Sequence, residues 1–202
     1  MKYIKKFENN AEYQTFVESA EYIEPHVSLS VEENEVHYNK VPEPPQTPKW
    51  IATYTDSHTE SAECDSSGEI GFNEIPNGSN VVSLEISDCV TSIGDNAFTD
   101  YHGLTSVAIP NSVTTIGSSA FAACSGLTSV VIPSSVISID SWAFSNCSGL
   151  TSITVNATTP PTLGANAFYN TNCPIYVPAE SVDAYKAAEG WSEYADRIQP
   201  IV

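Results

Sequence analysis

Residues that could perform catalysis or bind a metal ion are scattered along this 202-residue chain. Asp100, His102 and Ser106 are close in sequence, and a carboxylate, an imidazole and a hydroxyl are the groups of a hydrolytic triad. Their spacing implies no contact between a base and a nucleophile, so a solvent-facing loop is the favoured interpretation. The four histidines share no short-range ligand spacing, and the segment that begins at Asp65 lacks the regular ligand alternation of a calcium loop. We therefore predict no enzyme activity, no cofactor and no metal site.

The five cysteines carry the remaining candidate chemistry. They are too few and too scattered for a disulfide scaffold, and none forms a C-x-x-C pair, so a structural zinc site is not expected. Cys124 and Cys147 occupy the same position of the repeat described below. Stacked strands lie about 4.8 Å apart, which is compatible with the Cα separation of a disulfide, roughly 4.4–6.8 Å. Because equivalent side chains in a stack point the same way, a ladder of buried thiols is favoured, with a disulfide as the alternative.

A pattern repeated every 23 residues must position all of these side chains. Its first copy is Val81-Val-Ser-Leu-Glu-Ile, and later copies begin with Leu-Thr-Ser at Leu104, Leu127 and Leu150. Each copy continues with a second short apolar element and then an Ala-Phe pair. The last pair is displaced by one additional residue in the preceding segment. The phenylalanines of the four pairs are Phe98, Phe121, Phe144 and Phe168.

Each unit predicts a short strand, a tight turn, a second extended piece, and a turn or 3₁₀ segment that carries the Ala-Phe pair. In the third copy, period-two alternation places Val130 and Ile132 on one face and Ser129 and Val131 on the other. A unit of this length cannot bury its own apolar residues. Stacking is therefore expected to build one core from the phenylalanine column and from an isoleucine column formed by Ile93, Ile116 and Ile139.

The repeat closely resembles the BspA-like class of bacterial leucine-rich repeats. The resemblance covers residues 81–178 and rests on the pattern L-T-S-[VI]-x-I-P-x-S-V-x-x-I-G-x-x-A-F-x-x-C-S-G. The stretch from Ala157 to Lys186 is similar to the final repeat and cap of such proteins in gut bacteria. The resemblance implies a right-handed repeat solenoid with a parallel sheet along one side and no active site. Members are mostly cell-surface or secreted proteins implicated in adhesion and host-protein binding.

The residues before the repeats differ in composition. Residues 1–40 predict a small α+β leader, with an amphipathic helix over Asn10–Glu18 and a hairpin that pairs Val27–Val31 with Val36–Tyr38. This leader resembles the leading segments of modular surface and phage-tail-like proteins of gut bacteria. The Pro-rich residues 41–49 predict a stiff, extended linker.

Both ends of a solenoid need caps, since terminal repeats would otherwise expose the core. Residues 50–80 predict an N-terminal cap, in which a hairpin is followed by a degenerate repeat from Ile70. Residues 179–202 predict a C-terminal capping helix with Ser181 as its N-cap, Asp183 in its first turn and Gly190 beyond its end. The cap residues expected to pack on the last repeat are Val182, Tyr185 and Trp191.

The charge of the chain limits its partners. Acidic residues outnumber basic ones by 25 to 7, the formal net charge is −18, and no Lys or Arg lies between Trp50 and Tyr185. Such a surface cannot neutralise phosphates, so nucleic acid and anionic membranes are excluded as partners. No apolar run is long enough to span a bilayer. Glu8 lies where the apolar stretch of a secretory signal would begin, so no signal peptide is recognisable. The cell surface, a virion and the cytosol therefore all remain possible locations.

The outward positions of the repeats are the candidate partner-binding residues. They are Ser106, Ala108, Ser129, Val131, Ser152 and Thr154. Their small side chains either serve only as good strand formers or contact a protein or glycan, as sheet faces of solenoids commonly do. We predict a non-enzymatic binding and display module for surface adhesion or host interaction. The alternatives are a phage or prophage appendage component, which would oligomerise through residues 1–40, and a cytosolic scaffold.

Overall fold

Two units make up the computed structural model, Met1–Gln46 and Thr47–Val202, and each is described by itself. The structure describes residues 2–6, 27–32, 35–40 and 48–202. The first unit contains a three-stranded antiparallel sheet with the order β1-β3-β2. Its strands are β1 (Lys2–Lys6), β2 (Val27–Glu32) and β3 (Glu35–Lys40).

The hairpin predicted in this unit is present, and Val31 of β2 lies opposite Val36 of β3. Strand β1 was not predicted, because Lys2–Lys6 carries no turn signal and its strand is formed by pairing with the distant β3. The helix predicted over Asn10–Glu18 and most of the predicted linker lie outside the described residues.

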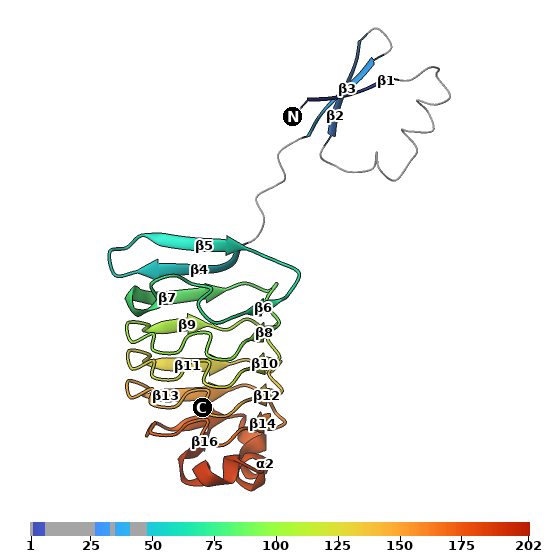
Figure 1. The fold of residues 1–202 in the computed structure, drawn as a ribbon. Coiled ribbons are helices and arrows are strands. Elements are labelled where there is room, and N and C mark those ends of the chain that lie inside the picture. The colour runs from blue at the N-terminus through green and yellow to red at the C-terminus, as the bar shows by residue number, and fades with distance from the viewer. Residues whose placement is uncertain (1, 7–26, 33–34, 41–47) are drawn as a thin grey trace. The chain divides into compact units, whose positions relative to one another are not determined.

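The second unit is a stack of coils whose long strands run along one side (Figure 1). Strand β7 pairs in parallel with β9, and β11 pairs in parallel with β13, which pairs with β15. Equivalent residues of successive coils lie opposite one another, as Val130 and Ile153 do. The long strands are β7 (Val81–Ile86), β9 (Ser106–Ala108), β11 (Ser129–Ile132), β13 (Ser152–Val155) and β15 (Ile175–Val177).

Short strands form a second, five-stranded sheet with the order β14-β12-β10-β8-β6. All neighbouring strands in it are parallel. The predicted column of Ile93, Ile116 and Ile139 is fully buried, Ile70 of β6 extends it, and β14 contributes the partly buried Leu163. The degenerate first repeat therefore joins the stack as predicted. The short strands are β6 (Glu69–Ile70), β8 (Ser92–Ile93), β10 (Thr115–Ile116), β12 (Ser138–Ile139) and β14 (Thr162–Leu163).

The Ala-Phe segments are turns that stack on one another. Backbone hydrogen bonds join successive turns, for example from Phe98 N to Ala120 O at 2.7 Å. The phenylalanine column is confirmed: the ring of Phe121 lies 5.0 Å from that of Phe98 and 5.0 Å from that of Phe144. Phe144 and Phe168 continue the column at 5.8 Å. These rings are fully or almost fully buried and belong to the core of the stack.

An antiparallel hairpin closes the N-terminal end of the stack, as predicted. It consists of β4 (Pro48–Tyr54) and β5 (Thr59–Glu63), and β4 pairs antiparallel with β7. Trp50, Ala52 and Tyr54 of β4 alternate with more exposed residues and are buried against the first coil. The 3₁₀ helix η1 (Gly78–Asn80) leads into β7.

The C-terminal cap packs as predicted but contains more elements than the predicted helix. Tyr185 and Trp191 are fully buried, and their polar atoms donate hydrogen bonds to Ala157 O at 2.8 Å and Pro161 O at 2.7 Å. Val182 packs against this core while remaining partly exposed. The elements of the cap are η2 (Ala179–Ser181), α2 (Val182–Ala187), η3 (Trp191–Arg197) and β16 (Ile198–Pro200).

Two details of the C-terminal cap differ from the sequence prediction. Ser181 occupies the N-cap position, but its side chain makes no capping hydrogen bond. The reason is that η2 runs directly into α2, so Ser181 already has helical backbone angles and its hydroxyl faces no free first turn. Strand β16, which pairs in parallel with β15, was not predicted. Gly190 lies beyond the end of α2, as predicted, but it also precedes a second helical segment as the N-cap residue of η3, with a positive φ of 76°.

Candidate functional site

The predicted partner-binding residues all lie on the outer face of the long strands. Ser106, Ala108, Ser129 and Val131 are exposed, whereas Ser152 and Thr154 are half-buried. Parallel pairing places Ser129 beside Ser152, and Val131 beside Thr154. The outward positions thus form rows within each group of paired long strands, one from β7 to β9 and the other from β11 to β15.

The rows extend beyond the residues singled out from the repeats. On the N-terminal side Ser83 lies beside Ser106, and Glu85 lies beside Ala108. On the C-terminal side Tyr176 lies beside Thr154, and Gln199 follows Tyr176. Tyr176 and Gln199 stand outside the recurring Leu-Thr-Ser pattern, and only their register in the sheet assigns them to this face.

A threonine directly precedes β9, β11 and β13, and it has a structural role. Its hydroxyl and its backbone N–H both donate to one carbonyl of the preceding coil. Thr128 Oγ1 lies 3.2 Å from Thr105 O, and Thr151 Oγ1 lies 2.9 Å from Thr128 O. The recurrence of Thr therefore follows from joining coils, while the serine after it is the residue that faces outward.

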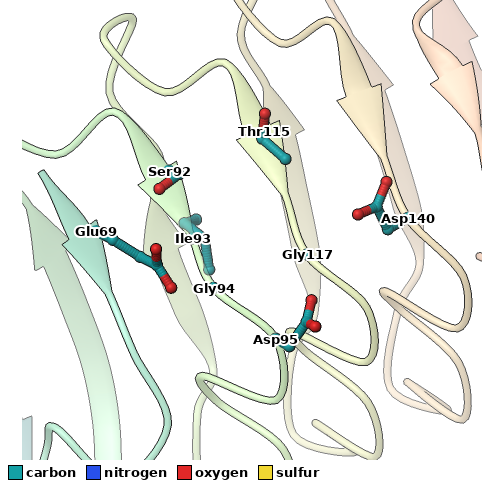
Figure 2. Close-up of a pocket in the computed structure, with 8 residues that line it drawn as sticks. All are labelled: Glu69, Ser92, Ile93, Gly94, Asp95, Thr115, Gly117 and Asp140. Carbon is teal, nitrogen blue, oxygen red and sulfur yellow. The ribbon is translucent and has the colours of Figure 1, made fainter. Parts of the chain in front are cut away.

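A groove of about 410 Å³ crosses the short-strand side of the stack (Figure 2). Its three carboxylates come from different coils, and two of them accept hydrogen bonds within the fold. Asp95 Oδ1 lies 2.7 Å from Ser118 N, and Asp140 Oδ1 lies 2.7 Å from Ser138 Oγ. Within residues 48–202, no group of three or more acidic, histidine or cysteine side chains is placed to hold a metal ion. The groove is lined by Glu69, Ser92, Ile93, Gly94, Asp95, Thr115, Gly117 and Asp140.

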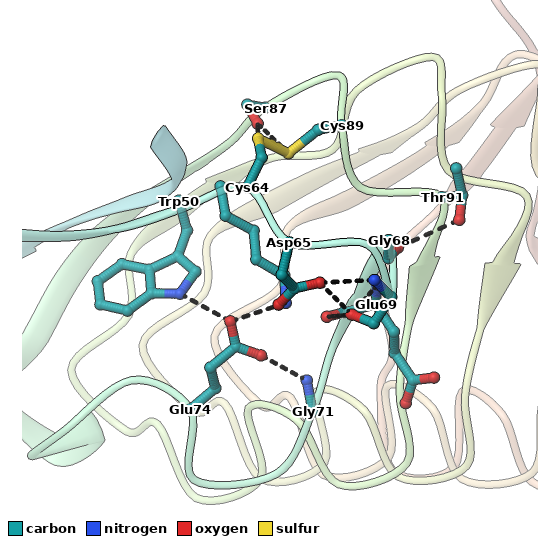
Figure 3. A network of polar contacts seen from close by, with 12 residues as sticks. Trp50, Cys64, Asp65, Gly68, Glu69, Gly71, Glu74, Ser87, Cys89 and Thr91 are labelled. Carbon is teal, nitrogen blue, oxygen red and sulfur yellow. Dashed lines mark hydrogen bonds and ion pairs between the residues drawn. A yellow bond between two sulfur atoms is a disulfide. The ribbon is translucent and has the colours of Figure 1, made fainter. Parts of the chain in front are cut away.

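A buried lysine organises the N-terminal cap (Figure 3). The side chain of Lys49 is 2% exposed, and its Nζ lies 2.8 Å from Asp65 Oδ2 and 3.0 Å from Glu74 Oε1. Burial alone would lower the pKa of Lys49, but hydrogen bonds to the two carboxylates raise it above its usual value. The same contact with Lys49, together with hydrogen bonds from Ser67, holds the pKa of Asp65 well below its usual range.

Glu74 also accepts hydrogen bonds from Trp50 Nε1 at 3.1 Å and Gly71 N at 3.0 Å. The network therefore joins the hairpin to the first repeat, and each polar atom in it is used in that joining. Such an ion pair, with all of its members already satisfied, indicates a structural role and leaves no donor set for a ligand.

The cysteines divide into one disulfide and three free thiols. Cys64 and Cys89 form a disulfide that ties the end of β5 to the turn after β7. This bond was not predicted from the sequence, because its partners stand 25 residues apart, in different elements, without a recognisable spacing motif. The free cysteines are Cys124, Cys147 and Cys173, and all three are buried.

The thiol ladder predicted for Cys124 and Cys147 is confirmed. Each thiol donates to a carbonyl of the preceding coil, Cys124 to Phe98 O at 3.1 Å and Cys147 to Phe121 O at 3.0 Å. The neighbouring Cys147 thiol and burial raise the pKa of Cys124 far above its usual value. A thiol kept protonated in this way is a poor nucleophile, so the ladder serves packing.

Tyr101 takes the position of these cysteines in the first full coil. Its hydroxyl donates to Ile75 O at 3.0 Å, and burial raises its pKa to about 12. The side chain reaches under Gly78, where an added Cβ would lie 2.1 Å from the tyrosine ring. Tyr101 therefore seals the stack beneath the N-terminal cap.

His102, considered above for a hydrolytic triad, is exposed at the edge of a turn. One of its ring nitrogens, Nδ1, lies 2.9 Å from Ala123 O, and the other, Nε2, lies 4.0 Å from Asp100 Oδ1. The contact through Nδ1 engages the backbone of the next coil, so this ring links turns of the solenoid.

The geometry described above, parallel coils with 23-residue register and buried apolar columns, agrees with a family comparison. The model of the BspA type leucine-rich repeat region matches residues 69–183 in six copies. This chain belongs to the BspA type leucine-rich repeat family. Repeats of this family indicate a protein-binding or surface repeat module, and leucine-rich repeat families in general are non-enzymatic binding modules.

A solved structure also resembles this BspA type chain. It is the crystal structure of a leucine-rich repeat protein from Bacteroides ovatus ATCC 8483, with 18% sequence identity and a TM-score of 0.33. The alignment covers 78% of this chain and 59% of that one, so the chain spans less than two thirds of its length. No curated protein matches the chain significantly. Among the described residues, no helix is both long enough and apolar enough to cross a membrane.

Proposed function

We propose that the chain is a non-enzymatic binding and display module that presents the outer face of its long strands to a protein or glycan. The observation that carries the proposal is the register of that face, in which small serine side chains lie opposite one another, Ser83 beside Ser106 and Ser129 beside Ser152. A face of this kind offers hydroxyl groups and a flat contour. It therefore suits a partner that is recognised by shape and hydrogen bonds.

Surface adhesion or host interaction is the setting that we propose for this module. The family to which the repeats belong supports this setting. The Cys64–Cys89 disulfide supports it as well, because disulfides persist in oxidising environments and are rare in the reducing cytosol. A purely cytosolic scaffold is therefore less well supported than a surface or extracellular module.

Two substitutions test the sheet face directly. Ser129→Glu and Thr154→Arg place a charge in the middle of two adjacent rows. We expect each to weaken binding on the order of tenfold, because a charge buried against an uncharged partner is left unpaired. The measurement is surface-plasmon resonance against partners found by screening extracellular-matrix proteins and bacterial glycans.

Ser148→Glu is the matched control for these variants, because Ser148 is exposed in the turn before β13 and lies off the outer face. It should bind the same partners as the native chain. Unchanged binding by both Ser129→Glu and Thr154→Arg would show that the long-strand face is not the contact surface.

The N-terminal unit favours one alternative function, an appendage component of a phage or prophage. Among the strands that the structure describes in this unit, β1 and β2 are the two edges of the three-stranded sheet. Edge strands of this kind can join further chains. A trimer in sedimentation analysis that reverts to a monomer without residues 1–40 would favour the appendage over the adhesin.

A further inference from the structure

Two large aromatic side chains lie exposed and in contact on the turn side of the solenoid. Trp142 follows β12 and is 40% exposed, and Tyr169 follows β14 and is 52% exposed. Their ring centroids are 5.5 Å apart and their planes cross at 67°. Exposed rings that pair in this way keep apolar area in water, and they differ from the single exposed residues Val131 and Ile137 in forming an aromatic pair.

The backbone at Trp142 adds a second, independent observation. Its φ is 63°, in the left-handed region that bulky side chains disfavour. The equivalent positions in the other turns carry residues better suited to this region or small ones, namely Asn96, Ser119 and Asn166. Asparagine would thus suit the fold better than tryptophan here. A strained residue that does not serve packing points to a function for its side chain.

The turns that carry the two rings are held rigidly together. Trp142 N donates to Ala165 O at 3.1 Å, and Asn146 N donates to Tyr169 O at 2.8 Å. Beside the rings lie the exposed amides of Asn146 and Asn170. Asn170 Nδ2 donates a hydrogen bond to Asn146 Oδ1 at 3.0 Å. The result is a fixed aromatic corner flanked by neutral groups that can both donate and accept hydrogen bonds.

We propose that Trp142, Tyr169, Asn146 and Asn170 form a binding site for a neutral carbohydrate. The apolar C–H face of a pyranose ring can stack on one aromatic ring while its edge meets the other, and its hydroxyl groups can bond to the amides. The charge pattern favours a neutral sugar, because no Lys or Arg lies between Trp50 and Tyr185. Arg197 comes near the site at Thr171, but its guanidinium donates to Thr171 O and lies over the ring of Tyr194. A protein anchor would need an apolar rim, and here the rim is amide.

This site lies on the turns and not on the long strands, so it goes beyond the sheet-face proposal and can fail or stand separately from it. The proposed test is an array of neutral oligosaccharides of glucose, galactose and N-acetylglucosamine, printed beside sialylated and sulfated ones. The native full-length chain should bind members of the neutral set and not the acidic set. Titration with each bound oligosaccharide, followed by tryptophan fluorescence, then gives the affinity.

Trp142→Asn separates binding from structure, because it restores the residue type of the equivalent turns. We expect it to lower affinity on the order of tenfold or more while the melting temperature stays equal or rises. Tyr169→Ala should lower affinity similarly, since alanine already occupies the equivalent position at Ala122.

Ile137→Thr is the matched control, because it removes another exposed apolar side chain, 66% exposed, and restores the threonine found at Thr114. It should bind like the native chain, and so should Ser129→Glu. The proposal is overturned if the native chain binds no neutral oligosaccharide, or if Trp142→Asn and Tyr169→Ala both bind within twofold of it.

Discussion

Replacing Phe121 by alanine should lower the free energy of unfolding by about 3–5 kcal/mol, the usual range for removing a fully buried phenylalanine. Phe121 is 0% exposed and stacks between Phe98 and Phe144, with both ring centroids 5.0 Å away. Its removal would leave a cavity bounded by two neighbouring rings. Those rings are fixed by backbone hydrogen bonds between turns, so the coils can close the cavity only in part.

Urea unfolding followed by circular dichroism measures this loss. Val131→Ala is the control, since Val131 is 50% exposed on the outer face and its truncation should change stability by no more than about 0.5 kcal/mol. A loss below about 1 kcal/mol for Phe121→Ala would contradict the stacked phenylalanine column as the main core of the solenoid.

The repeat fold could be predicted because each of its signals recurs. A single Leu-Thr-Ser segment is a weak indication of a strand, but three copies at constant spacing, preceded by the related Val81-Val-Ser, require the same conformation and the same neighbours. Stacking then follows from the inability of one coil to bury its apolar residues. The columns of Ile and Phe and the outward Ser positions are consequences of that register, so they were predictable to the residue.

Features outside the repeat were harder to predict, because each depends on one long-range contact. Strand β1 exists through its pairing with β3, and β16 through its pairing with β15. The expected cap at Ser181 fails because a 3₁₀ turn precedes the helix, and turn type is not determined by the serine itself. No periodic pattern carries such information.

Among the candidate site residues, too, those that recur with the repeat could be predicted and those that depend on one contact could not. The six outward residues follow from alternation within a strand, whereas Tyr176 and Gln199 join them only through the observed register. The aromatic corner was missed for a different reason. Trp142 is visible in the sequence as a tryptophan in a column of Asn and Ser, but the repeat pattern predicts only the residues that agree with the column. In a repeat protein, a departure from the column is itself the signal of a specialised site.

The Cys64–Cys89 disulfide leads to the second large effect that we expect. Replacing both cysteines by serine should lower the free energy of unfolding by about 3 kcal/mol, because the bond closes a loop across a separation of 25 residues. The loop contains β6, η1 and β7, and the bond ties it to the end of the hairpin, which is also attached through the Lys49 network and the pairing of β4 with β7. Loss of the bond should therefore loosen the cap before the central coils.

The reductant dependence of unfolding provides the control. Native protein unfolded in urea should expose three thiols without reductant, and its stability should fall to that of the double variant once the disulfide is reduced. The double variant should show no effect of reductant, because its remaining cysteines are already free. Equal stability of oxidised and reduced native protein would mean that the cap is held by the hairpin and the Lys49 network alone. A cytosolic chain would be kept reduced. If reduction lowers the free energy of unfolding by about 3 kcal/mol, the cap is fully stable only in an oxidising compartment such as the cell exterior.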